Sequence, residues 1–60
     1  MPSDETRKLL KLFGVAITNL EDAIERKAPT AEVVKYDMEA ADRTRDVINF
    51  VDRLRSRRYN

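Results

Sequence analysis

The stretch Arg26-Lys27-Ala28-Pro29-Thr30 interrupts a chain whose remaining pattern is helical. Proline disfavours a helical conformation in the residue before it, and threonine is a good N-cap, so the stretch predicts a turn at 28–30 and a new helix after it. The two basic residues before the turn carry the charge that a helix C-terminus prefers. A short link between two helices favours antiparallel packing. We therefore predict an all-α fold, a two-helix antiparallel hairpin.

The first helix is predicted for about residues 4–27. Ser3 is a good N-cap, and Asp4 and Glu5 follow in the first turn, where the helix dipole favours negative charge. The apolar residues recur at spacings of three and four, which is the heptad-like pattern of a helix that packs along its length. This first stripe consists of Leu10, Phe13, Ile17, Leu20 and Ile24.

The second helix is predicted for about residues 31–57. If the chain were one helix kinked at Pro29, the first stripe would continue onto Arg45, Asp52 and Arg55, which are charged. The observed second stripe is rotated from that position by roughly 120°, so two separate helices fit the pattern better. This stripe contains Val33, Ala40, Thr44, Val47, Val51 and Leu54, with Val34, Ala41 and Ile48 on one flank and Tyr36 and Phe50 on the other.

The apolar surface of the second helix is wider than a lone hairpin can bury. A chain of 60 residues has a thin core, and without Cys or His it lacks disulfides and the commonest transition-metal ligands. Oligomerisation is the remaining support, so we predict that residues 1–60 form one domain that assembles as a homodimeric four-helix bundle of coiled-coil type. The predicted core and oligomer interface comprise Leu10, Phe13, Ile17, Leu20, Ile24, Val33, Val34, Ala40, Ala41, Val47, Ile48, Val51 and Leu54.

Two polar residues, Asp37 and Thr44, interrupt the second stripe. They have three interpretations: a polar site inside the bundle, a threonine bonded to its own helix with an aspartate at the rim, or a polar device that sets register and oligomeric state. The second interpretation needs no special function, and we prefer it.

Catalysis and metal binding are not indicated. Without His or Cys, only carboxylates, Lys or Tyr could act as general acids or bases. Pairs of carboxylates four residues apart could bind a cation, but a solvent-exposed helix face explains them better. Most carboxylates are spaced for surface ion pairs instead. These predicted pairs are Asp4 with Lys8, Asp22 with Arg26, Glu32 with Lys35 and Glu39 with Arg43. We predict no enzyme, no cofactor and no small-molecule substrate.

Charge is unevenly distributed although the net charge is only +1. Residues 19–39 carry six carboxylates against three basic residues, whereas residues 40–60 carry six Arg against three Asp. An antiparallel hairpin places the basic segments together at the termini and the acidic segment at the turn. This basic pole favours either antiparallel assembly of hairpins or anion and nucleic-acid contacts. The candidate contacts are Arg7, Lys8, Lys11, Arg53, Arg55, Arg57 and Arg58.

These patterns favour a small non-enzymatic interaction module, such as an adaptor, regulator or accessory subunit. Its partner is expected to be a second copy of the chain or another helical protein. The alternative is a regulator that binds RNA or DNA through the basic pole. The apolar runs are too short to span a membrane and the acidic start is not that of a signal peptide, so we expect a cytoplasmic protein.

Overall fold

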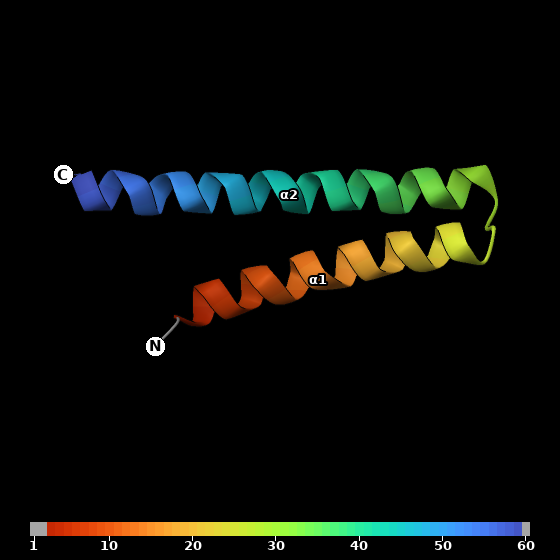
Figure 1. Cartoon of the computed structure of the whole chain (residues 1–60), viewed down its shortest axis with the longest axis horizontal. Helices are drawn as coiled ribbons and strands as arrows, with labels where there is room; N and C mark the ends of the chain where they lie inside the picture. Colours follow the sequence, from red (N-terminus) through yellow and green to blue (C-terminus); the bar gives the residue numbers. More distant parts are fainter. Residues whose placement is uncertain (1–2, 60) are drawn as a thin grey trace.

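The computed structural model describes residues 3–59, which form two helices packed against each other in an antiparallel hairpin (Figure 1). Helix α1 spans Asp4–Glu25 and helix α2 spans Thr30–Tyr59. The predicted all-helical hairpin is therefore confirmed. Because α1 has 22 residues and α2 has 30, the C-terminal end of α2 extends beyond the start of α1.

The start of α1 is capped by Ser3, as predicted. The Ser3 hydroxyl oxygen accepts a hydrogen bond from the Thr6 backbone N–H at 3.1 Å, and the Arg7 N–H bonds to the Ser3 carbonyl at the same distance. Asp4 and Glu5 lie in the first turn, next to the positive end of the helix dipole.

The end of α1 is a closed turn centred on Lys27. Lys27 has a left-handed backbone with φ of 55°. Its N–H bonds to the Ile24 carbonyl at 3.2 Å, and the Ala28 N–H bonds to the Ala23 carbonyl at 2.9 Å. This pair of bonds is the Schellman arrangement, which satisfies carbonyls that a helix end leaves without partners. Since Lys27 has left the helical conformation, α1 ends at Glu25 rather than at about residue 27.

Replacing Lys27 with glycine is expected to raise the free energy of unfolding by about 1 kcal/mol, because glycine adopts a left-handed backbone without the steric cost that a Cβ imposes. The measurement is urea unfolding followed by circular dichroism at one fixed protein concentration. Lys27→Ala removes the same charge but keeps the Cβ, so it should show no such gain. Equal stability of the two variants would contradict the prediction.

The start of α2 differs from the prediction by one residue. The Pro29 carbonyl accepts hydrogen bonds from the N–H groups of Glu32 at 2.9 Å and Val33 at 3.1 Å. Pro29 is therefore the N-cap residue and Thr30 is the first helical residue, so the prediction of Thr30 as N-cap was wrong. Proline is tolerated at this position because its N–H would lie outside the helical hydrogen-bond ladder, so its absence costs no helical bond.

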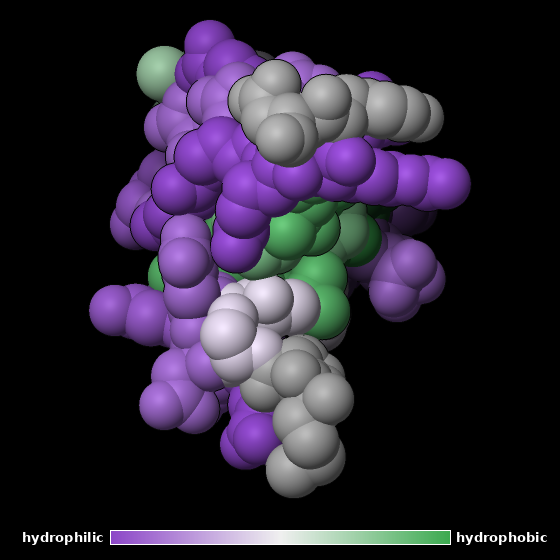
Figure 2. All heavy atoms as spheres, turned by 90° about the vertical axis from the view of Figure 1, so that its left-hand side faces the viewer, coloured by the Kyte–Doolittle hydropathy of each residue, from purple (hydrophilic) through white to green (hydrophobic). Residues whose placement is uncertain are grey.

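The contact between the helices combines small side chains with one large ring. Among the described residues, Ala16, Ala23, Ala40 and Phe50 are buried. Figure 1 shows the helices close together at the turn and further apart toward the termini. Seen from the open end, hydrophobic atoms fill the space between the two helices (Figure 2). Half-buried apolar side chains complete the contact: Leu9, Phe13, Leu20, Val33, Tyr36 and Val47.

The hairpin leaves more surface in contact with solvent than its size requires. It measures 47 × 19 × 12 Å and has a radius of gyration of 14.3 Å, whereas a compact domain of this length has a radius of roughly 10 Å. Its accessible surface is 5064 Å², against roughly 4000 Å² for a typical folded monomer of this mass. Neither helix within residues 3–59 is long and apolar enough to cross a membrane.

Candidate helix-association face

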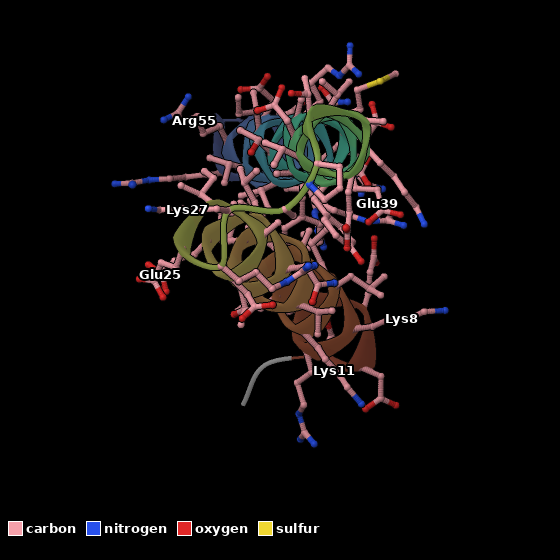
Figure 3. The ribbon with its side chains drawn as sticks, turned by 90° about the vertical axis from the view of Figure 1, so that its right-hand side faces the viewer. Lys8, Lys11, Glu25, Lys27, Glu39 and Arg55 are labelled. Atoms are coloured by element: carbon pink, nitrogen blue, oxygen red, sulfur yellow. The ribbon has the colours of Figure 1, made fainter. Side chains whose placement is uncertain are left out.

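One side of the hairpin carries a shallow groove between the helices. Leu12, Val15 and Asn19 line it from α1, and Glu39 and Arg43 line it from α2. We call this side the grooved face. Seen from the turn end, Glu39 and Lys8 point to this side and Arg55 points to the opposite side (Figure 3).

In each helix, a row of buried residues faces the other helix. The grooved face lies on one side of this row, and the opposite side of the hairpin lies on the other. On α1 the positions on that opposite side are Leu10, Ile17 and Ile24, which repeat every seven residues. On α2, Arg55 marks this side in Figure 3, and Ile48 precedes Arg55 by one heptad. We call this side the apolar face. Its members are Leu10, Ile17, Ile24, Val34, Ala41, Ile48 and Val51.

The side chains of the apolar face are exposed in the hairpin. Leu10 and Ile24 are 56% and 58% exposed, and Ile17 between them is 39% exposed. A second hollow lies on this helix, lined by Ile17, Leu20 and Ile24 together with Glu21 and Glu25. A row of large aliphatic side chains on one face is typical of a surface that another helix covers.

The structure divides the predicted interface residues into two groups. Phe13, Leu20, Val33, Ala40 and Val47 lie in the contact between α1 and α2. The others are exposed: Leu10, Ile17, Ile24, Val34, Ala41, Ile48, Val51 and Leu54. Their burial against another chain stays a prediction.

Sequence reasoning placed Phe50 on a flank of α2, whereas the structure buries it. The signal was present as the spacing Val33, Tyr36, Ala40, Arg43, Val47, Phe50, which alternates steps of three and four residues. The basic Arg43 within that series obscures it, because an arginine keeps its charged end in water while its stem covers apolar surface.

The polar pair on α2 lies on the same side as the apolar face. Asp37 and Thr44 are both exposed, and the Thr44 hydroxyl donates to the Ala40 carbonyl of its own helix at 2.8 Å. This bond supports the interpretation that needs no internal polar site. A role of the pair in setting register between chains stays a prediction.

The turn is clamped by Arg26, which contacts carboxylates of both helices. Its Nε donates to Asp22 Oδ2 at 3.0 Å, and its Nη1 and Nη2 donate to the two carboxylate oxygens of Glu32. The predicted Asp22–Arg26 pair is thus confirmed. Two other predicted pairs differ in the structure. Glu32 bonds to Arg26 and not to Lys35. Arg43 bonds to Asp46 at 3.1 Å and not to Glu39, because another carboxylate lies within reach on the same helix.

Hydrogen bonds from Arg26 lower the pKa of Glu32, and the bonds to Glu32 and Asp22 raise the pKa of Arg26. Because the Glu32 pKa is lower in the folded than in the unfolded chain, this clamp stabilises the hairpin above the unfolded pKa and is lost as pH falls through the folded one.

Replacing Arg26 with glutamine is expected to return the Glu32 pKa toward its ordinary value, since its main hydrogen-bond donor is removed. The measurement is an NMR titration of the side-chain carboxyl carbon. Asp22→Asn removes the other partner of Arg26 and should leave the Glu32 pKa low. An unchanged Glu32 pKa in Arg26→Gln would contradict the clamp.

The basic pole gathers at one end of the hairpin but not on one surface. The N-terminal end of α1 and the C-terminal end of α2 lie at the same end (Figure 1). Arg53 bonds to Glu5 across the helices at 3.1 Å, and Arg55 bonds to Asp52 at 3.5 Å. Lys8, Lys11 and Arg55 point in three different directions (Figure 3). Part of the basic charge is therefore paired with carboxylates of the same hairpin.

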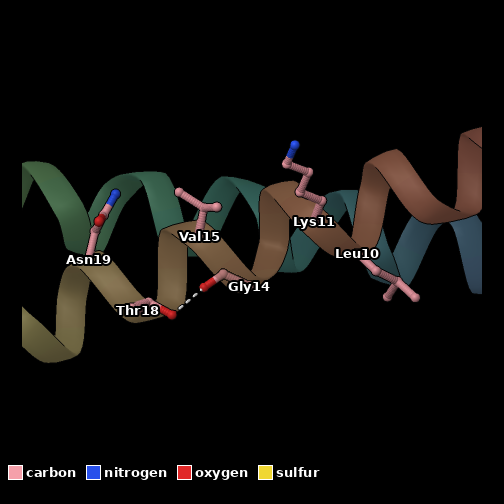
Figure 4. A pocket seen from close by; sticks show the side chains of 6 residues that line it. All are labelled: Leu10, Lys11, Gly14, Val15, Thr18 and Asn19. Atoms are coloured by element: carbon pink, nitrogen blue, oxygen red, sulfur yellow. Dashed lines mark hydrogen bonds between the residues drawn. The ribbon is translucent and has the colours of Figure 1, made fainter.

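A further hollow on α1 surrounds Gly14 (Figure 4). All of its lining residues, among them Leu10, Lys11 and Val15, belong to α1, and the Thr18 hydroxyl donates to the Gly14 carbonyl at 2.8 Å. A Cβ added at Gly14 would meet no atom within 4 Å. Gly14 therefore faces open space on the outer side of α1.

Within the described part of the chain, no group of three or more carboxylate, His or Cys side chains is arranged to hold a metal ion. In comparisons with known proteins, no family model, no curated protein and no solved structure matches this chain.

Proposed function

We propose that this protein is a small non-enzymatic interaction module that acts through helix–helix association. The observation that carries the proposal is the apolar face, where large aliphatic side chains from both helices are exposed on one side of the hairpin. Burying apolar surface is the dominant favourable contribution to most protein association. Adaptors, regulators and accessory subunits are the classes of protein that fit such a surface.

The excess surface of the hairpin supports the proposal quantitatively. The chain exposes 5064 Å², roughly 1000 Å² more than a typical folded monomer of its mass. An interface that removed this excess from two partners would bury roughly 2000 Å² in total, which is at the upper end of the standard size for a specific complex. The simplest such assembly is a four-helix bundle of two hairpins.

Sedimentation equilibrium over a wide range of protein concentration tests the proposal, with helicity measured by circular dichroism on the same samples. We expect a helical dimer or tetramer whose helicity falls on dilution as it dissociates. A helical monomer at every concentration would contradict the proposal. A weakly helical monomer would assign the apolar face to a different helical protein.

The alternative function, nucleic-acid binding, has the charge of the basic pole in its favour. The C-terminal end of α2, where Arg55, Arg57 and Arg58 lie, is the segment that extends past α1. Binding of a labelled oligonucleotide that weakens steeply with salt, and is lost when these arginines become glutamine, would support it. The spread of basic side chains over several sides of the hairpin favours the interaction module.

A further inference from the structure

We propose that the partner of the apolar face is a second copy of this chain, packed antiparallel, with α2 of one copy against α2 of the other and a two-fold axis beside Thr44. This inference rests on the proposed function and adds the identity, orientation and register of the partner.

The charge of α2 changes sign along its length. Residues 30–42 carry four carboxylates and one Lys, whereas residues 43–59 carry six Arg and two Asp. Two α2 helices packed antiparallel place the acidic half of each beside the basic half of the other. The surface is therefore complementary to itself, which a closed two-fold interface requires.

The hairpin geometry connects orientation to helix pairing. When two hairpins stack face to face and antiparallel, the two-fold axis is perpendicular to the helices, so each helix packs on its own copy. When they stack parallel, the axis runs along the helices, and α2 packs on α1 of the other copy. Parallel stacking brings the two basic poles together, and like charges at an interface are unfavourable. The charge pattern therefore selects the antiparallel arrangement.

The register follows from overlapping the apolar stripe of α2 with itself. The exposed large aliphatic side chains of α2 run from Val34 to Leu54, so complete overlap places the two-fold axis near their midpoint, beside Thr44. Ala41 lies about one turn before Thr44, and both side chains are small and exposed. Small side chains at the axis let two helices approach closely at this point. Asp37 and Val51 lie seven residues on either side of Thr44, so each faces the other across the axis.

Single cysteines test this arrangement cleanly, because the natural chain has no Cys. Thr44→Cys should be joined into covalent dimers by a short bismaleimide in high yield. Glu39→Cys, on the grooved face, is the matched control and should give at least tenfold less dimer. Both variants are first shown by sedimentation to associate as the wild type does.

A mixed experiment tests the orientation. Asp37→Cys and Val51→Cys should each give little covalent dimer alone, because each cysteine lies roughly 21 Å along the helix from its own copy. An equal mixture of the two should give a strong mixed dimer. In a parallel dimer α2 packs on α1 of the other copy, so Thr44→Cys instead joins to Ile17→Cys, the central position of the apolar face on α1.

The possible outcomes of these experiments test the identity of the partner and its orientation separately. Thr44→Cys dimers together with the Asp37/Val51 mixed dimer support the antiparallel second copy. A stable dimer that joins Thr44→Cys to Ile17→Cys overturns the orientation and leaves self-association intact. A wild-type chain that stays monomeric at every concentration overturns the second copy altogether.

Discussion

Replacing Ile17 with aspartate is expected to raise the dissociation constant of the dimer by about 100-fold or more. Ile17 lies at the centre of the apolar face on α1, between Leu10 and Ile24, and 39% of its surface is exposed in the hairpin. Full burial of an isoleucine contributes roughly 1.5–3 kcal/mol, and a dimer contains two copies. Because each side chain is already partly covered within its own hairpin, we expect a combined loss of about 3 kcal/mol, which corresponds to roughly 100-fold.

The matched control for this prediction is Val15→Asp. Val15 is 50% exposed on the same helix, only two residues away, but it lines the groove on the other side of the hairpin. Sedimentation equilibrium on both variants should show weakened association for Ile17→Asp alone. Equal weakening of both would mean that any loss of apolar surface on α1 disrupts the hairpin. No weakening of either would remove Ile17 from the interface.

The turn and the helices could be predicted from the sequence because local chemistry determines them. Pro29 interrupts the helical pattern, and Ser3 caps α1 through its own side chain. The end of α1 could not be placed to the residue. It depends on Lys27 adopting a left-handed backbone, a conformation that sequence patterns indicate for glycine but not for lysine.

The face that each helix turns toward the other was harder to predict. The apolar stripe of α1 is roughly 160° wide at 100° per residue, so it contains two rows that could each form a contact. The structure buries the row with Ala16 and Ala23 inside the hairpin and leaves the row with Ile17 exposed. Small side chains allow close approach of two helices joined by a short turn, whereas the sequence pattern alone favours the larger side chains.

The basic pole shows the limit of counting charges along a sequence. The hairpin does bring the start of α1 and the C-terminal part of α2 to the same end of the molecule, as predicted. Ion pairs across and within the helices, such as Arg53 with Glu5, then depend on which side of a helix each residue occupies. A sequence window averages over those sides, so it predicts where charge accumulates but not whether it forms one surface.

Replacing Phe50 with alanine is expected to destabilise the hairpin by about 3 kcal/mol or more. Truncating a buried phenylalanine typically costs about 3–5 kcal/mol, since apolar burial is lost and a cavity remains. Phe50 is 7% exposed and is the largest buried side chain among the described residues, and the Arg53 guanidinium lies 5.4 Å from its ring centre. In a chain of 60 residues, whose core is thin, such a loss should abolish the cooperative unfolding transition.

The measurement is urea unfolding followed by circular dichroism at one protein concentration, with Met38→Ala as control. Met38 is 63% exposed on the same helix, so its truncation should change stability by less than about 0.5 kcal/mol. Equal effects of the two variants would mean that Phe50 does not hold the helices together.

Comparison with Ile17→Asp then distinguishes the contact within the hairpin from the contact between copies. Phe50→Ala should lower helicity and association together at every concentration, because it acts on the hairpin itself. Ile17→Asp should lower helicity only to the extent that the dimer dissociates, because its side chain acts between copies.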